Sequence, residues 1–204
     1  MKSVIVSGSH RKNSQSYKVS EWLSQALSHK TGDHSAEIID LAHDVFPLWE
    51  ESAWKKESDL ARSVAPHLEC VEHADSIILV APEWGGMVTA ALKNFLLYIS
   101  SQHTAHKPCL IVGVSSGRGG SYPVSELRMS GFKNNRMVFI PDHLIIQDVQ
   151  DVMNDHDAVK GEKDDLYIKD RANYTLDVLI AYSDSLKAMR DNNNLRNKLY
   201  PFGM

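Results

Sequence analysis

The chain has 204 residues, of which 43% are apolar and 24% are charged, and its formal net charge is -4. This length and composition are typical of one globular domain, so we expect a single domain over residues 1–204. The mild acidity, without a basic stripe, argues against a nucleic-acid partner. The apolar runs are too short to cross a bilayer, and the first predicted strand follows Met1 and Lys2 directly, which leaves no room for a signal peptide. We therefore expect a cytoplasmic protein without a membrane partner.

The residue types that often bind metals are not clustered in the sequence. Cys70 and Cys109 lie far apart and have no CxxC spacing. His103 and His106 are three residues apart, but no acidic or Cys partner stands near them at ligand spacing. We expect buried reduced thiols, a solvated pair of histidines and no metal site.

The first elements form a strand-helix-strand unit. Residues 3–7 contain an unbroken run of β-branched residues, which predicts a strand buried on both faces. Apolar residues then recur at helical spacing from Ser14 to a predicted end near residues 31–33, and residues 36–41 are a second strand candidate. Such a unit requires a parallel pair of strands.

The same alternation continues to the end of the chain. The sequence predicts helices over 60–71, 88–99, from about 124, and over 164–189, with strands over 75–81, 108–115 and 137–140. Residues 147–163 are acidic and weakly patterned, so we expect an exposed excursion, and the polar residues 191–194 end the last helix. Five strands alternating with helices indicate one doubly wound α/β domain.

The turn after the first strand predicts a phosphate site. It offers the hydroxyls of Ser9, Ser14 and Ser16, the guanidinium of Arg11, and the positive end of the following helix. The sequence lacks both GxxxxGK[ST] and GxGxxG, which disfavours a P-loop hydrolase and the dinucleotide fingerprint.

Two further turns follow strands of the same predicted sheet. In Pro82–Gly86, a rigid Pro and two glycines allow a flat ligand to approach the backbone, and Trp84 is a candidate to stack on it. Residues 115–121 contain three glycines around Arg118 and expose backbone donors. Because ligands bind at the carboxyl ends of parallel strands, one phosphate site and two glycine-rich walls predict a pocket for a planar mononucleotide.

These turns resemble one known family. Gly8-Ser9-His10-Arg11-Lys12-Asn13-Ser14 is similar to the phosphate signature of the NADPH-dependent FMN reductase family, a flavodoxin-like group. Pro82-Glu83-Trp84-Gly85-Gly86, followed by Ala91-Leu92-Lys93-Asn94, resembles its flavin-ring turn and next helix, with Trp84 and Gly85 at the positions of the usual Tyr and Asn. Gly117-Arg118-Gly119-Gly120 resembles its third flavin loop. The resemblance covers residues 3–145.

The resemblance implies a fold, an activity and a set of site residues. It implies a flavodoxin-like five-stranded parallel sheet in the order 2-1-3-4-5 and one FMN-binding domain over residues 1–204. It further implies noncovalent FMN, hydride uptake from NADPH or NADH, a flavin, quinone or similar small molecule as acceptor, and a homodimer or homotetramer. The expected cofactor-binding residues are Ser9, Arg11, Ser14, Gln15, Ser16, Pro82, Glu83, Trp84, Gly85, Gly86, Ser115, Ser116, Gly117, Arg118 and Gly119.

Several alternatives remain open from the sequence. A flavodoxin-type electron carrier or a non-catalytic flavin-binding regulatory protein would use the same phosphate turn. Glu83 is either a titratable group in the pocket or a cap for the following helix, and Arg118 binds either a nucleotide phosphate or a neighbouring acid. His143, just beyond the fifth predicted strand, is more simply a loop histidine than a ligand contact. No catalytic residue of the protein is assigned.

Overall fold

The computed structural model describes residues 1–30, 34–154 and 162–192. In these ranges no helix has the length and the apolar character that a membrane span requires. In chain order the elements are β1 (Lys2–Ser7), α1 (Gln15–Lys30), β2 (Ser35–Asp40), the 3-10 helix η1 (Glu51–Trp54), α2 (Asp59–His73), β3 (Ser76–Trp84), β4 (Met87–Val88), α3 (Ala90–Tyr98), α4 (Ser101–Thr104), β5 (Pro108–Val114), α5 (Ser121–Met129), β6 (Val138–Ile146) and α6 (Glu162–Asn192).

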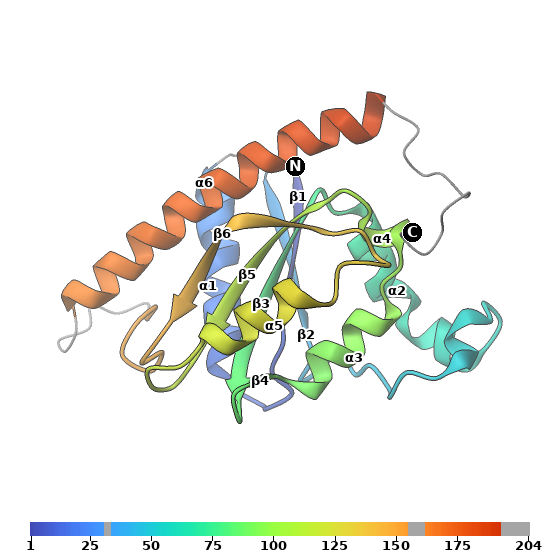
Figure 1. The fold of residues 1–204 in the computed structure, drawn as a ribbon, viewed down its shortest axis with the longest axis horizontal. Helices are drawn as coiled ribbons and strands as arrows, with labels where there is room; N and C mark the ends of the chain where they lie inside the picture. The colour runs from blue at the N-terminus through green and yellow to red at the C-terminus, as the bar shows by residue number, and fades with distance from the viewer. Residues whose placement is uncertain (31–33, 155–161, 193–204) are drawn as a thin grey trace.

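The sheet confirms the predicted α/β architecture and adds one strand to it. Five strands pair in parallel in the order β2-β1-β3-β5-β6 (Figure 1). The sixth, β4, is a two-residue strand that pairs antiparallel with the end of β3. The expectation of five strands was therefore one short, because a two-residue strand has no detectable alternation of its own.

Helices cover both faces of the sheet. On one face α1 and α6 bury Leu23, Leu27, Leu176 and Leu179 against the strands. On the other face α2, α3 and α5 supply a second apolar cluster, in which Phe95 is fully buried. The central strands β1, β3 and β5 contact both layers, which is why their sequences are continuously apolar instead of alternating.

Two strands run further than their sequences predicted. β3 extends past residue 81 through Pro82 to Trp84, because its end pairs with β4. β6 extends past residue 140 through Pro141 to Ile146, although Pro usually interrupts a strand. β6 is the last strand of the described sheet, where a Pro is tolerated.

The extension of β6 depends on an irregularity and on one arginine. The register between β5 and β6 shifts between Cys109 and Ile111. Arg128 of α5 donates to the carbonyl oxygens of Ile140 and Pro141 at 2.8 and 2.9 Å, and to that of Asp142 at 3.4 Å. The guanidinium thus donates to carbonyl groups that, in a regular sheet, would accept hydrogen bonds from a neighbouring strand.

The segment after β6 corrects another expectation. Residues 147–154 are not simply an exposed excursion, because Val149, Val152 and Met153 are buried in the core on the α1 and α6 side. The rest of the expected excursion up to residue 161 lies outside the described residues, as do the predicted end of the first helix at 31–33 and the polar residues 193–194. Two helices also begin at other residues than predicted. α5 begins at Ser121 instead of about residue 124, and α3 begins at Ala90 instead of residue 88.

Candidate functional site

The turn between β1 and α1 is held firmly against the neighbouring strand. The backbone N–H of Gly8 donates to the carbonyl oxygen of Val80 in β3 at 2.8 Å. A Cβ atom at Gly8 would lie 2.6 Å from that oxygen, so only Gly fits this close approach. The carbonyl of Gly8 also accepts from the hydroxyl of Thr89, the residue that caps α3. These contacts fix where the following loop leaves the sheet.

The same turn gathers hydroxyl groups at the N-terminus of α1. Ser14 caps the helix, since its Oγ accepts from the N–H of Tyr17 at 3.1 Å, and Ser9 Oγ accepts from the N–H of Arg11 at 3.2 Å. A hydroxyl that accepts one bond still has its own O–H to donate. The guanidinium of Arg11 is exposed and has no partner among the described residues. The turn therefore presents donors and positive charge, which suits an anion.

A buried acceptor lies beside these donors. The side-chain oxygen Oε1 of Gln15 is inaccessible to solvent and has no hydrogen-bond partner within the described part of the chain. The hydroxyl of Ser7, at the end of β1, is in the same condition. Buried polar atoms in proteins are normally paired, so the site suits a ligand that brings a donor to Gln15.

The end of β3 forms a hairpin with β4. Gly85 and Gly86 connect the two strands with φ values of 58° and 74°, which an L-residue rarely adopts. Trp84 precedes them, and its ring makes an edge contact with the ring of His10, with the centroids 4.6 Å apart. The hairpin therefore meets the turn after β1 through this aromatic pair.

Glu83 has a structural partner in another helix. Its Oε2 accepts from the backbone N–H of Gly120 at 2.5 Å, at the N-terminus of α5. Glu83 therefore interacts with the N-terminus of a helix, as one of the two alternatives from the sequence expected. The helix is α5, however, and not the next helix along the chain, α3, which Thr89 caps. The carboxylate thereby joins the end of β3 to the turn after β5.

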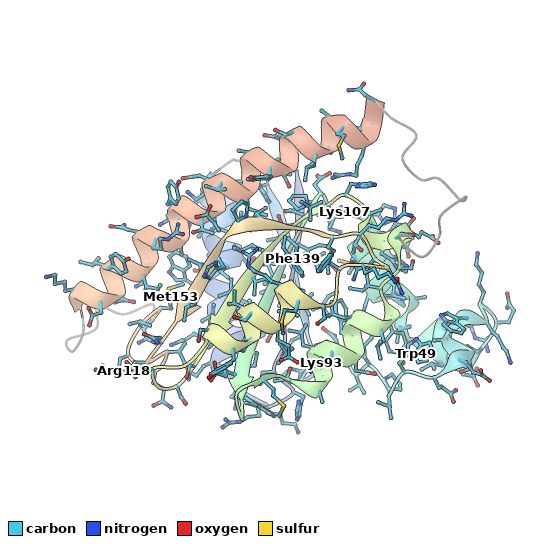
Figure 2. The ribbon with its side chains drawn as sticks, in the orientation of Figure 1. Trp49, Lys93, Lys107, Arg118, Phe139 and Met153 are labelled. Atoms are coloured by element: carbon cyan, nitrogen blue, oxygen red, sulfur yellow. The ribbon has the colours of Figure 1, made fainter. Side chains whose placement is uncertain are left out.

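The turn after β5 is bound to the segment that follows β6. Ser115 accepts from the N–H of Val149 at 3.1 Å, and Gly117 accepts from that of Asp148 at 2.9 Å. The N–H of Gly117 donates to Ser115 Oγ at 3.2 Å. Figure 2 shows Arg118 at the outer end of this turn, where its side chain is exposed. Part of the backbone that was expected to face a ligand is thus used within the protein.

One cavity of 220 Å³ lies where these three segments meet. It brings together ten of the residues predicted from the sequence: Ser9, Arg11, Ser14, Gln15, Ser16, Pro82, Glu83, Trp84, Ser115 and Ser116. The other five predicted residues, Gly85, Gly86, Gly117, Arg118 and Gly119, do not line it. The cavity is smaller than the usual range of about 300–1,000 Å³ for drug-sized ligands. Its volume therefore suits one part of a mononucleotide and is too small for the whole.

Four lining residues were not predicted: Asn13, Val114, Val149 and Gln150. A weak signal for Val149 was present, because Val149, Val152 and Met153 recur at spacings of three and four. That pattern is typical of a segment with one buried side.

Larger hollows occur elsewhere on the described surface. One of 710 Å³ lies between η1, α2 and the end of α3, and includes Trp49 and Trp54; another of 460 Å³ lies between α3 and α5. Neither is lined by residues of the three turns. The cavity of 220 Å³ is the better candidate, because the N-terminal end of α1, the hydroxyl donors and the guanidinium of Arg11 meet there.

The cysteines do not supply a nucleophile to the site. Burial raises the pKa of Cys70 to about 12. Burial also raises the pKa of Cys109, which is fully inaccessible in β5. Both thiols therefore stay protonated at neutral pH, which excludes thiolate chemistry at these two positions.

Comparison with known sequences identifies the family. Residues 1–151 match the family described as NADPH-dependent FMN reductase. The chain therefore belongs to this family, which confirms the family predicted from the sequence. It is accordingly an NAD(P)H-dependent oxidoreductase, and the FMN and NADPH in the family's description agree with the predicted cofactor and co-substrate.

Two sequence relatives agree with this assignment, and one solved structure agrees with the fold. An FMN-dependent NADPH-azoreductase of Staphylococcus aureus (strain USA300) is 27% identical over 188 residues, 89% of this chain and 95% of the relative. An NADPH azoreductase of Bacillus sp. (strain OY1-2) is 27% identical over 131 residues, 64% of this chain and 68% of the relative. The flavoenzyme FerB, an NAD(P)H:(acceptor) oxidoreductase from Paracoccus denitrificans, has a TM-score of 0.67 at 18% identity, covering 92% of this chain and 97% of its own. This likeness supports a flavodoxin-like fold.

Proposed function

We propose that the protein is an FMN-dependent oxidoreductase that takes hydride from NAD(P)H onto bound FMN and reduces a flavin, quinone or similar small acceptor. The observation that carries the proposal is the convergence of the turns after β1 and β5 and the end of β3 at one cavity. In an open parallel sheet, nucleotides bind beyond the carboxyl ends of the strands at such a point.

The residues at the start of α1 fit the phosphate and chain of FMN. The hydroxyls of Ser9, Ser14 and Ser16 and the helix N-terminus supply donors, and Arg11 supplies the charge. Gln15 Oε1, which has no partner in the described chain, fits a hydroxyl of the ribityl chain. The donors at the start of α1 and the unpaired acceptor of Gln15 thus match a phosphorylated polyol.

The remaining walls fit a planar ring. Pro82 and Trp84 offer flat apolar surface, and Ser115 and Ser116 offer small side chains and backbone. Bound FMN would supply the redox chemistry, and the chain would supply orientation and electrostatics. Among the lining residues Arg11 and Glu83 are titratable, and Glu83 already binds the N-terminus of α5, so we assign no acid or base.

The proposal keeps the full set of predicted cofactor-binding residues. Gly85, Gly86, Gly117, Arg118 and Gly119 flank the lining residues in sequence and would contact the part of FMN that the cavity does not enclose. NADPH is favoured over NADH by the names of the azoreductase relatives. The relatives named as azoreductases support a small organic acceptor. We further propose one domain over residues 1–204 and a cytoplasmic homodimer or homotetramer.

The visible spectrum of the purified protein tests the cofactor. We expect a yellow protein whose flavin absorbance is bleached by NADPH in the absence of oxygen. A colourless protein that also fails to bind added FMN would refute the proposal.

Turnover separates an enzyme from an electron carrier. We expect sustained NADPH oxidation when a quinone or free FMN is present in excess. A protein that binds FMN but shows negligible turnover would instead be a carrier of the flavodoxin type, and one whose spectrum NADPH leaves unchanged would be a flavin-binding regulatory protein.

A further inference from the structure

The segment after β6 forms one wall of the candidate cofactor site. Val149 and Gln150 line the cavity together with the turns after β1 and β5. Backbone hydrogen bonds from Asp148 and Val149 attach the start of this segment to the turn after β5. Its later residues Val152 and Met153 are buried in the core below α6, on the side of the molecule where Figure 2 labels Met153.

Lys18 of α1 also holds this segment. Its ammonium Nζ donates to the carbonyl oxygens of Val149 and Val152 at 2.5 and 2.9 Å and to Oδ1 of Asn154 at 2.8 Å. Three acceptors match the three N–H donors of an ammonium. Lys18 lies in the first turn of α1 but does not line the cavity. Its charge is therefore directed at the wall and not at the ligand.

The far end of the segment is held by α6. Asp165 is buried, and its Oδ1 accepts from the N–H of Met153 at 2.6 Å. Lys169 pairs with Asp165 at 2.6 Å and donates to the carbonyl oxygen of Asn154 at 2.8 Å. The contact to α6 would thus keep the end of the segment in place if the Lys18 contact were lost, so that removing Lys18 frees chiefly the part that faces the cavity.

We propose that Lys18 is a positioning residue for the cofactor: by fixing the Val149–Gln150 wall against the N-terminus of α1, it slows the release of FMN. The proposal rests on the FMN-binding function proposed above. Its physical basis is that Lys18 connects the helix turn that would bind the phosphate to the wall beside it. Loss of these charged hydrogen bonds lets the wall separate from α1 and opens a route for release.

The test compares two lysine substitutions in the same helix. Lys18→Met removes the three bonds to the wall but keeps the length of the side chain. Lys30→Met is the matched control, because Lys30 pairs with Asp177 of α6 at 2.7 Å at the other end of α1, away from the cavity. The dissociation rate of FMN is measured by the recovery of flavin fluorescence after dilution, and amide hydrogen exchange is measured without FMN.

We expect FMN to leave Lys18→Met at least about tenfold faster than it leaves the parent, a size that corresponds to the loss of one charge-assisted hydrogen bond. Lys30→Met should release FMN at the parental rate. Without FMN, the amides of Asp148 and Val149 should exchange faster in Lys18→Met alone, because those amides report the attachment of the wall.

Two further variants guard against a general loss of structure. Asn154→Ala removes one acceptor of Lys18 and leaves α1 intact, so we expect a smaller acceleration in the same direction. Lys18→Arg keeps the charge and should restore most of the slow release. Equal release rates in the parent and in Lys18→Met would refute the role of Lys18. A parent that binds no FMN would refute the proposed function instead, while hydrogen exchange would still report on the wall.

Discussion

Replacing Glu83 by Ala should destabilise the protein even without a cofactor. Glu83 stands at the end of β3, and its carboxylate accepts from the N–H of Gly120 at 2.5 Å. Gly119 approaches the same carboxylate so closely that a Cβ there would lie 2.7 Å from Oε1. The substitution leaves the N-terminus of α5 without its anionic partner and removes the side-chain contact between the end of β3 and the turn after β5.

The expected size follows from the kind of bond and its exposure. A hydrogen bond from a backbone N–H to a carboxylate contributes about 1.5–3 kcal/mol. Glu83 is partly exposed, so solvent screening lowers the expected loss in the free energy of unfolding to about 1–2 kcal/mol. For a chain of this size, each kcal/mol lowers the unfolding midpoint by about 2–4 °C, so the total shift is about 2–8 °C.

Thermal unfolding of FMN-free protein, followed by circular dichroism, measures this shift. Glu57→Ala is the control, because Glu57 is almost fully exposed and lies 3.9 Å from its ion-pair partner Arg62. The control should unfold at the parental temperature. Glu83→Gln keeps an acceptor oxygen and should fall between Glu83→Ala and the parent. If Glu83→Ala unfolds like the parent, the carboxylate does not join the two segments as argued.

Three other substitutions test separate parts of the structure. Arg11→Ala should weaken FMN binding by about 10- to 150-fold, which corresponds to the loss of one charge-assisted phosphate contact. Equilibrium fluorescence titration measures the affinity, and an effect no larger than that of Lys12→Ala would contradict the phosphate assignment. Burial lowers the pKa of His34 below its value in the unfolded chain, so stability should decrease as the pH falls through about 6.5. Between pH 7.5 and 5.5, the free energy of unfolding measured with urea should decrease less in His34→Gln than in the parent. An identical decrease in the two proteins would exclude His34 as the cause. Gly113→Ala would place a Cβ 2.1 Å from a backbone carbonyl oxygen at the start of α5, so it should lower the free energy of unfolding by about 1–3 kcal/mol in the same assay. Gly117→Ala should be tolerated, because a Cβ there would meet no atom within 4 Å.

The sequence predicted the elements whose pattern is local. The β-branched run at residues 4–6 and the helical spacing of Val19, Leu23 and Leu27 are signals that need no knowledge of distant residues, and β1 and α1 lie where expected. The order of turns along the chain sufficed to bring Ser9–Ser16, Pro82–Trp84 and Ser115–Ser116 to one edge, because parallel strands share that edge.

The differences arise where distant partners decide the structure. β6 passes Pro141 because Arg128 and the register shift accommodate it, and neither is visible in the strand's own sequence. Val149 is buried, and its carbonyl accepts from Lys18, which precedes it by 131 residues. Glu83 binds Gly120 because β3 and β5 are neighbours, although its sequence position suggested the helix that follows it.

The way Arg128 is bound to β6 has a consequence for association between molecules. β6 is the last strand of the described sheet, and such a strand can recruit a strand from another chain through its unpaired backbone groups. In β6 the carbonyls of Ile140 and Pro141 are occupied by a side chain of the same molecule, and Pro141 has no N–H to donate. The middle of this strand is therefore a poor template, and the arginine that shapes the sheet also protects it from edge-to-edge aggregation.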